Sequence, residues 1–198
     1  LNTTGGTPNA RGGTRNLGND SGAVSFKSTW SPASNARVTA VARYARTQAD
    51  FNDSDSNSAS KTFGYTIDTP GAHFINEAVY GLLRGELDLL DGKWTQALTG
   101  QIADTTRNGY GATARTYGDT GQRLKGSYES TLKLNQGALR HQFTVAVDIE
   151  RERYRNTDPT GFAFTGRRQV DNVGIVGQYD LTLGEHAAFG ASLRQDLN

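Results

Sequence analysis

From residue 23 onward, apolar and polar residues alternate with a period of two, and turns separate the alternating segments. In the clearest segment, 139–152, the two kinds of side chain fall on opposite parities: Leu139, Phe143, Val145, Val147 and Ile149 on one, and Arg140, Gln142, Thr144, Asp148, Glu150 and Glu152 on the other. A helix repeats every 3.6 residues and would mix these sets. The pattern therefore predicts β-strands with one apolar and one polar face.

Short turns group these strands into four antiparallel hairpins. The predicted partners are 23–30 with 36–46, 78–89 with 94–107, 123–134 with 139–152, and 170–183 with 187–196. The turns are 31–35, Asp91-Gly92, Gln136-Gly137 and Gly184-Glu185-His186, of which Asp91-Gly92 suits the positive φ angles of a type I′ turn. The result is an all-β, antiparallel up-and-down meander of about eight long strands.

Cross-strand pairing tests the hairpin assignment, because like faces must come together. In the third hairpin, the apolar pairs are Leu134 with Leu139, Leu132 with His141, Tyr128 with Val145 and Leu124 with Ile149. The same register pairs Lys125 with Asp148 and Arg123 with Glu150, and each such pair contributes about 0.2–1 kcal/mol. In the second and fourth hairpins the expected pairs are Leu89 with Trp94, Gly85 with Leu98, Leu181 with Phe189 and Tyr179 with Ala191.

The connectors between hairpins are long and polar, unlike the turns within them. They cover 50–75, 108–121 and 156–166, and a similar Gly-rich loop fills 1–22 before the strand-forming part, 23–198. Short turns at one end and long loops at the other are typical of an up-and-down barrel.

Strand length and aromatic placement indicate which face meets water. The predicted strands exceed the five or six residues usual in globular sheets and reach the roughly 9–11 of a tilted membrane strand. Trp30 and Trp94 adjoin short turns, and Tyr44 and Tyr154 lie near the long-loop ends, as expected of aromatic belts at a membrane interface. The polar face is too charged to fill an eight-stranded barrel. The sequence therefore predicts part of a larger transmembrane β-barrel whose apolar face meets lipid.

The amino-acid composition excludes several kinds of binding site and one class of membrane protein. The 198 residues include 24 Gly and no Cys, and their formal charge is +1. Disulfides and thiolate metal sites are therefore excluded, and no overall positive field favours nucleic acid. No apolar run approaches the roughly 20 residues of a membrane-spanning helix, so a helical membrane protein is excluded. The opening Leu1-Asn2-Thr3 favours a piece of a longer protein.

Several stretches carry a family resemblance. They are Gly18-Asn19-Asp20-Ser21-Gly22 followed by 23–27, then 37–44, 166–179 and 189–196. In their order along the chain, these stretches resemble barrel strands of TonB-dependent outer-membrane receptors, and most closely those of vitamin B12 receptors.

The resemblance implies a barrel of about 22 strands around a plug. Such a protein imports a scarce nutrient, cobalamin or an iron chelate, across the outer membrane of a Gram-negative bacterium. The implied partners are outer-membrane lipid, the nutrient, and TonB acting through a plug that this chain lacks. Two alternatives stay open: a soluble all-β domain that binds ligands or surfaces through its loops, and a passive porin-type channel.

A cluster of oxygen donors opens the first long loop. Asp50, Asp53 and Asp55 could hold Ca²⁺, although the EF-hand pattern fails because Ser58 and Gly64 occupy the positions of its Gly and Glu. Vitamin B12 receptors order outer loops with calcium, so the resemblance implies the same possibility here. The alternative is a solvated loop, and no other cofactor is predicted.

Aromatic residues in the long loops are candidate ligand contacts, since rigid rings suit a large, partly apolar ligand. The candidates are Phe51, Phe63, Tyr65, Tyr110, Tyr117 and Phe162. The same rings could instead pack loop against loop.

Enzyme chemistry finds no support in the sequence. Asp20-Ser21-Gly22 resembles the nucleophile loop of trypsin-like proteases, but those enzymes need a His earlier in the chain. All three His residues, His73, His141 and His186, come later. We therefore predict that the protein is not an enzyme.

Overall fold

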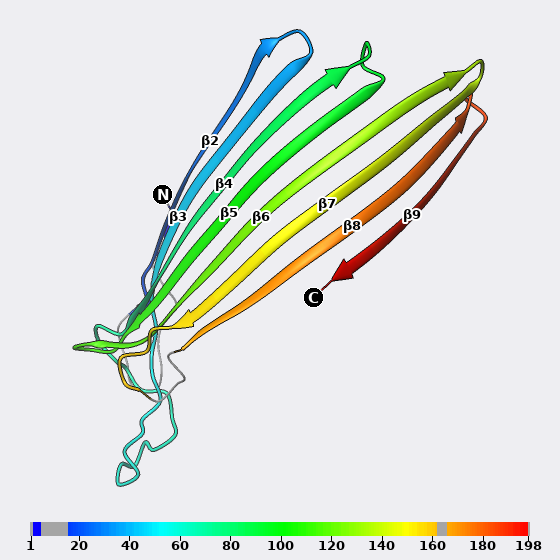
Figure 1. The fold of residues 1–198 in the computed structure, drawn as a ribbon. Coiled ribbons are helices and arrows are strands. Elements are labelled where there is room, and N and C mark those ends of the chain that lie inside the picture. The colour runs from blue at the N-terminus through cyan, green and yellow to red at the C-terminus, as the bar shows by residue number, and fades with distance from the viewer. Residues whose placement is uncertain (1, 5–15, 162–165, 198) are drawn as a thin grey trace.

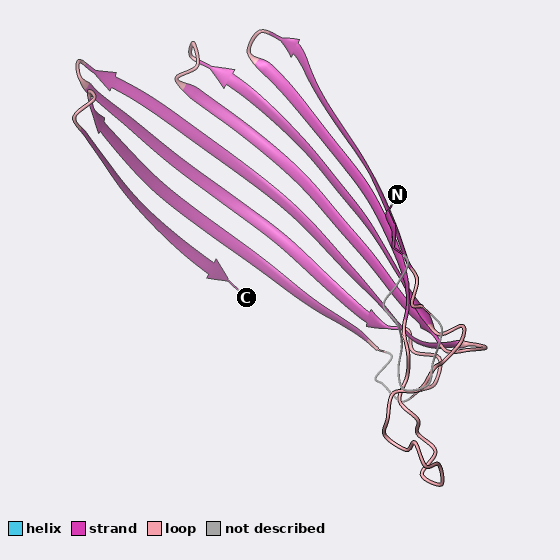
Figure 2. Ribbon diagram, turned by 180° about the vertical axis from the view of Figure 1, so that it is seen from behind, coloured by secondary structure: helices cyan, strands magenta, loops and turns pink. Residues whose placement is uncertain are grey.

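The computed structural model describes residues 2–4, 16–161 and 166–197, which form one antiparallel sheet of nine strands in sequence order. The strands are β1 (Asn2–Thr4), β2 (Asn19–Ala33), β3 (Ala36–Asp50), β4 (His73–Leu89), β5 (Trp94–Tyr110), β6 (Arg115–Gln136), β7 (Leu139–Asn156), β8 (Arg167–Leu183) and β9 (Ala187–Leu197). Figures 1 and 2 show a single curved layer, with short turns at one end and loops gathered at the other. The predicted meander of eight long strands is confirmed, and β1 adds a short ninth.

The sheet has two chemically different faces, fixed by the pairing register. We call the face that carries Phe143, Val145 and Ile149 the outer face and the opposite one the inner face. On the outer face Val145 is 53% exposed and Ile149 62% exposed. Among the described residues, Ala72 and Ala97 are the only buried apolar ones. The apolar face is therefore open rather than sealed in a compact core.

Two ion pairs on the inner face join strands that are not neighbours in the sheet. Arg84 on β4 reaches Glu129 on β6 at 3.7 Å, across β5, and Arg194 on β9 reaches Asp148 on β7 at 3.2 Å, across β8. The residues beneath these bridges are small: Ala97 on β5 pairs with Glu129, and Gly174 on β8 pairs with Asp148.

The predicted registers of the second and fourth hairpins agree with the structure. Leu89 faces Trp94, Gly85 faces Leu98, Leu181 faces Phe189 and Tyr179 faces Ala191, as expected. Asp91 and Gly92 have φ values of 55° and 79°, as a type I′ turn requires. In the first hairpin, β2 continues to Ala33, so the turn is shorter than 31–35.

The predicted register of β6 and β7 is wrong by two residues. Leu134 faces His141 instead of Leu139, because the chain turns tightly at 137–138 and Gln136 faces Leu139. A slip of two keeps every side chain on its face. The two predicted ion pairs still form as diagonal contacts: Lys125 Nζ lies 3.4 Å from Asp148 Oδ2, and Arg123 Nη2 lies 2.6 Å from Glu150 Oε2.

The long connectors are shorter than predicted, because backbone pairing continues beyond the apolar alternation. The predicted loop 108–121 is corrected to 111–114, since β5 and β6 extend to Tyr110 and from Arg115. The first long loop spans 51–72, and the leader 1–22 contains β1 and the start of β2. In the described part of the chain, no helix is long and apolar enough to cross a membrane.

Candidate functional site

An ionic network covers the inner face near the turns. Arg37 Nε lies 2.7 Å from Glu86 Oε2, and Arg84 Nε lies 3.2 Å from Glu86 Oε1. Arg84 also donates to Thr99 Oγ1 at 3.2 Å and reaches Glu129 across the sheet. Each charge in this network therefore has an opposite charge beside it.

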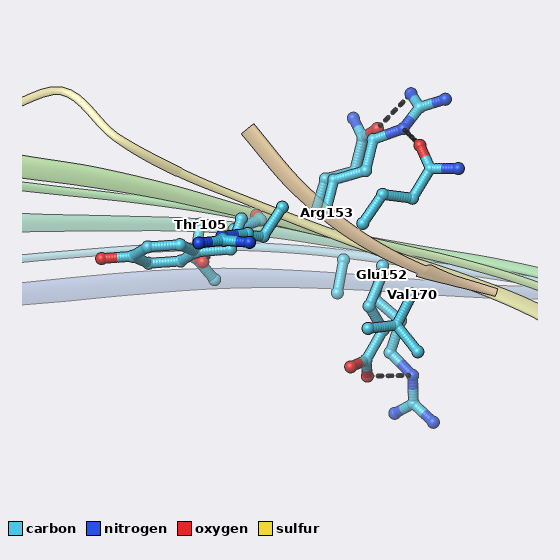
Figure 3. Close-up of a pocket in the computed structure, with 11 residues that line it drawn as sticks. Thr105, Glu152, Arg153 and Val170 are labelled. Atoms are coloured by element: carbon cyan, nitrogen blue, oxygen red, sulfur yellow. Dashed lines mark hydrogen bonds and ion pairs between the residues drawn. The ribbon is translucent and has the colours of Figure 1, made fainter. Parts of the chain in front are cut away.

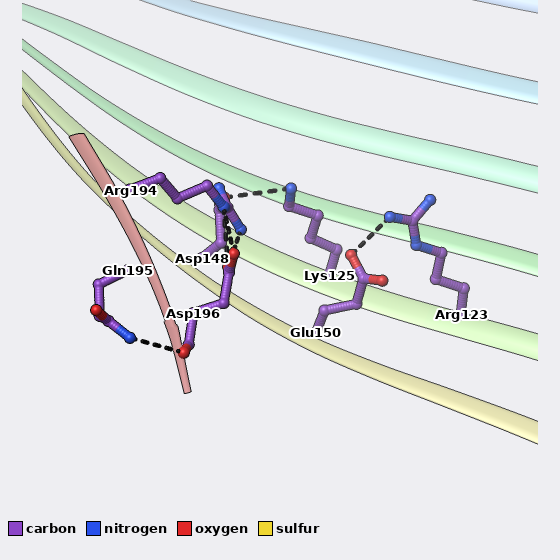
Figure 4. A network of polar contacts seen from close by, with 7 residues as sticks. All are labelled: Arg123, Lys125, Asp148, Glu150, Arg194, Gln195 and Asp196. Atoms are coloured by element: carbon purple, nitrogen blue, oxygen red, sulfur yellow. Dashed lines mark hydrogen bonds and ion pairs between the residues drawn. The ribbon is translucent and has the colours of Figure 1, made fainter. Parts of the chain in front are cut away.

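A second network lies on β6, β7 and β9 (Figure 4). Asp148 accepts from Arg194 and pairs with Lys125, and Arg194 also binds Asp196 at 2.7 Å. Arg194 can cross β8 because Gly174 has no side chain. A Cβ atom at this position would occupy the space of the Arg194 guanidinium. The missing side chain of this glycine thus permits the bridge.

Closer to the loops, one inner-face arginine, Arg107, contacts two aromatic rings, and Asp119 lies opposite it on β6. The Arg107 guanidinium carbon lies 5.6 Å from the ring centroid of Phe74 and 5.4 Å from that of Tyr117. Both distances are in the range of cation–π attraction. Tyr117 lies over Gly109, where a Cβ atom would collide with the ring. Sequence reasoning missed Arg107, although its parity places it with Phe74 and Tyr117.

A hollow of about 330 Å³ adjoins this cluster, and its inner-face lining includes Thr105, Tyr154 and Arg168. Arg123 Nε lies 3.6 Å from Glu152 Oε1 at its edge. Figure 3 shows Glu152 and Val170 on one side of the sheet and Arg153 on the other.

A neighbouring hollow of about 300 Å³ includes Tyr80 and shares Ala103 and Arg123 with the first. Tyr80 lies directly opposite Arg43, which is exposed on β3. Tyr80 and Arg43 therefore place a ring and a guanidinium group opposite each other near the middle of the inner face.

Tyr154 faces this hollow, so its predicted place in a lipid-facing belt is corrected. It shares the parity of Asp148 and Glu150, a signal that the sequence already contained. Trp30, Trp94 and Tyr44 lie on the outer face and are 64%, 38% and 39% exposed.

The aromatic candidates occupy separate places. Tyr117 joins Arg107, and Tyr110 stacks on His73 with ring centroids 4.7 Å apart. Phe63 and Tyr65 are 54% and 51% exposed on the loop 51–72. Phe51 is half-buried at the base of that loop, and Phe162 lies outside the described residues.

The three aspartates proposed for calcium are engaged in separate contacts. Asp50 Oδ2 accepts from the Gly18 amide at 3.1 Å, and Asp53 Oδ1 accepts from the Ser54 amide at 2.7 Å. Asp55 accepts from the Thr62 hydroxyl at 2.6 Å. In the described residues, no group of three or more His, Cys, Asp or Glu could hold a metal ion.

Hydrogen bonds to two loop carboxylates shift their acidity. Side-chain hydrogen bonds from Ser60 and Thr62, and then the Asn57 amide, lower the pKa of Asp55. The Thr160 hydroxyl and amide lower the pKa of Asp158 in the same way. These carboxylates order their loops as anions, because each bond favours the charged form.

A row of polar residues crosses the outer face where its apolar band ends. We call it the outer polar belt: Asp104, Gln122, Arg151, Arg153, Gln169 and Asp171. Its members are linked from β5 to β8, for example by Arg153 Nε donating to Gln169 Oε1 at 3.0 Å and Arg151 Nε donating to Asp171 Oδ1 at 2.6 Å. The sequence signal for the belt is the change from apolar to charged on the odd parity after Ile149.

Comparisons with known proteins identify solved structures that share this fold. No protein-family model and no curated protein matches the chain. Among solved structures, the ferric preacinetobactin receptor BauA from Acinetobacter baumannii is similar with a TM-score of 0.63 and 14% identity, over 91% of this chain and 34% of that one. The open form of the ferric-catecholate import receptor Fiu from E. coli K12 gives 0.67 and 13%, over 91% and 37%. The unliganded ferric citrate transporter FecA gives 0.61 and 13%, over 91% and 29%. The chain thus spans about a third of these structures and shares the fold of that part.

Proposed function

We propose that this chain forms part of the barrel wall of a TonB-dependent outer-membrane receptor in a Gram-negative bacterium, and that the receptor imports an iron chelate. The likeness to BauA, Fiu and FecA supports the receptor class. The open apolar outer face supports insertion in lipid, because soluble proteins rarely expose such large apolar patches. The ionic inner face then lines an interior that holds water or a plug.

The observation that favours an iron chelate is Arg107 held between Phe74 and Tyr117 at the loop end of the inner face. A cation supported by rings suits a ligand that carries negative charge and flat organic groups. Arg43 and Tyr80 extend the same chemistry onto β3 and β4. The networks nearer the turns lack this property, because carboxylates already pair with their cations.

In this proposal, the ligand is captured between the loops and the upper inner wall. Phe63 and Tyr65, exposed on the projecting loop, supply first contacts. Arg107 and its rings then hold the anionic chelate, while TonB displaces a plug to open the passage. Cobalamin, the alternative that the sequence resemblance implies, carries a single negative charge on its phosphodiester, so a cation held between rings suits it less well than a chelate with several negative charges.

The test is a titration of the detergent-purified, full-length protein that contains this chain with ferric catecholate, ferric citrate and cobalamin. Removing the charge of Arg107 by Arg107→Gln should weaken binding of the preferred ferric chelate about tenfold, as expected for a lost charge-assisted contact. Lys133→Gln, on the inner face beside the turns, is the matched control and should bind as the wild type does. Binding of cobalamin alone, or equal binding by both variants, would contradict the iron-chelate assignment.

The same titration with and without Ca²⁺ tests the calcium proposal for Asp50, Asp53 and Asp55. If the loop closes around the ion, calcium will tighten ligand binding in the wild type and leave binding by Asp53→Asn unchanged, whereas an equal response of both proteins would refute the calcium site. The separate hydrogen bonds of these aspartates give this proposal no support.

A further inference from the structure

Three arginines lie close together on the outer face, at the outer polar belt and on its side nearer the loops. Arg153 belongs to the belt, and Arg155 and Arg167 form the next row, where they lie directly opposite each other on β7 and β8. Like charges in this position repel and destabilise a sheet. In the described part of the chain, neither Arg155 nor Arg167 lies within ion-pairing distance of a carboxylate. The pair therefore lacks the neutralisation found elsewhere on the sheet.

These side chains surround a small polar hollow of about 180 Å³. Its outer-face lining consists of Asp104, Thr120, Gln122, Arg153, Arg155 and Arg167. Neighbours hold Arg153 in place, since it donates to Gln169 at 3.0 Å and to Gln122 at 3.4 Å. The hollow is smaller than the roughly 300–1,000 Å³ of sites for drug-sized ligands. It suits one compact anionic group.

The position of the hollow identifies the source of that anion. Apolar side chains cover the outer face below the belt, where Ile149 is 62% exposed and Ile175 is 44% exposed. A molecule bound in the hollow could thus extend acyl chains down this surface. Arginine matches phosphate through paired N–H donors, and basic clusters beside a bilayer bind anionic headgroups.

We propose that Arg153, Arg155 and Arg167 form a binding site for a phosphate of a lipid headgroup in the outer leaflet. The inference rests on the proposed membrane location of the chain. The bound phosphate would neutralise the opposed arginines, and the belt would set the depth of the barrel wall in the bilayer. The hollow and the inner-face ligand site lie on opposite sides of the sheet, so the two functions can be tested separately.

The experiment measures lipid retention by native mass spectrometry on the detergent-purified, full-length protein. The probes are diphosphorylated lipid A, the same lipid with both phosphates removed, and inorganic phosphate. Wild-type protein should retain the phosphorylated lipid, and Arg155→Gln/Arg167→Gln should bind it about 30-fold more weakly, from about fivefold per cation near an anionic surface. The dephosphorylated lipid should bind no better to the wild type than to the variant, and inorganic phosphate should bind more weakly than the lipid.

Lys27→Gln/Lys133→Gln is the matched control, because it removes two exposed cations from the inner face. It should retain the phosphorylated lipid as the wild type does. Equal retention by the arginine variant, or equal loss in the lysine control, would overturn the site. Ferric chelate binding and detergent extraction are measured on the same samples. A protein that inserts and binds chelate but ignores phosphorylated lipid refutes this inference alone, whereas a buffer-soluble protein refutes the proposed function.

Discussion

Val145 and Ala146 are neighbours on β7, yet their side chains enter different surroundings. Val145 is 53% exposed on the apolar outer face, and Ala146 faces Glu129 on the ionic inner face. The outer face offers dispersed apolar area, whereas the inner face offers charges held at short distances. The comparison shows that a single-layer sheet can present two surfaces, each suited to a different solvent.

A second difference runs along the inner face. Near the turns, Arg37 pairs with Glu86, and Arg84 pairs with both Glu86 and Glu129. Near the loops, Arg107 is supported by Phe74 and Tyr117. The cations at the turn end are thus paired with carboxylates, whereas Arg107 at the loop end contacts aromatic rings.

The strongest test of the two faces is a charge placed on each. Val145→Arg should lower the free energy of unfolding in lipid vesicles by about 2–4 kcal/mol, the cost of an arginine at mid-membrane depth. Urea titration followed by tryptophan fluorescence measures it. Ala146→Arg is the control, and it should change stability little because Glu129 lies opposite. Equal stability of the two variants would show that water covers both faces.

A smaller effect is expected where a glycine accommodates a ring. Gly109→Ala should displace Tyr117 from its place over the glycine and lower the free energy of unfolding by about 1–3 kcal/mol, as overpacking does. It should also weaken chelate binding by loosening the support of Arg107. Gly100→Ala on the same strand meets no atom within 4 Å and should be neutral or slightly stabilising. A neutral Gly109→Ala would mean that Tyr117 does not pack there.

The smallest effect concerns the projecting loop and acid. The pKa of Asp55 is lowered from its ordinary 3.8, so its stabilisation of the loop is complete above that value and is lost as the pH falls through the lowered pKa. Pepsin cleavage next to Phe63 should therefore increase at acid pH in the wild type. Asp55→Asn, compared at each pH, should be cleaved readily throughout. A constant ratio between the two proteins would contradict this role of Asp55.

The alternation of apolar and polar residues predicts most of the strands, but it does not predict the residues at which they end. Parity correctly separated Phe143 and Val145 from Asp148 and Glu150. The strand ends were missed because both faces become polar beyond the apolar band, although backbone pairing continues to Tyr110 and Arg115. Alternation depends on one buried or lipid-facing surface, and it carries no signal where both surfaces are polar.

The candidate site was less predictable than the wall. The sequence predicts Tyr117 as a loop aromatic, but parity is the only signal for its partner Arg107, because arginine is common in polar strands. Nearness to the long-loop end of a strand predicts a membrane-interface position for Tyr154, whereas its parity places it on the inner face. The two-residue period of a strand thus predicts the face of a side chain better than nearness to a strand end does.

The sequence by itself determined the sides of the sheet and the order of its strands, because the two-residue period of a strand and the turn residues are local properties. Only the tertiary structure decided how far β6 slides along β7, since a slip of two residues leaves both faces unchanged. It also decided that Arg194 reaches Asp148 across Gly174. That contact depends on the register of three paired strands, which no single strand specifies.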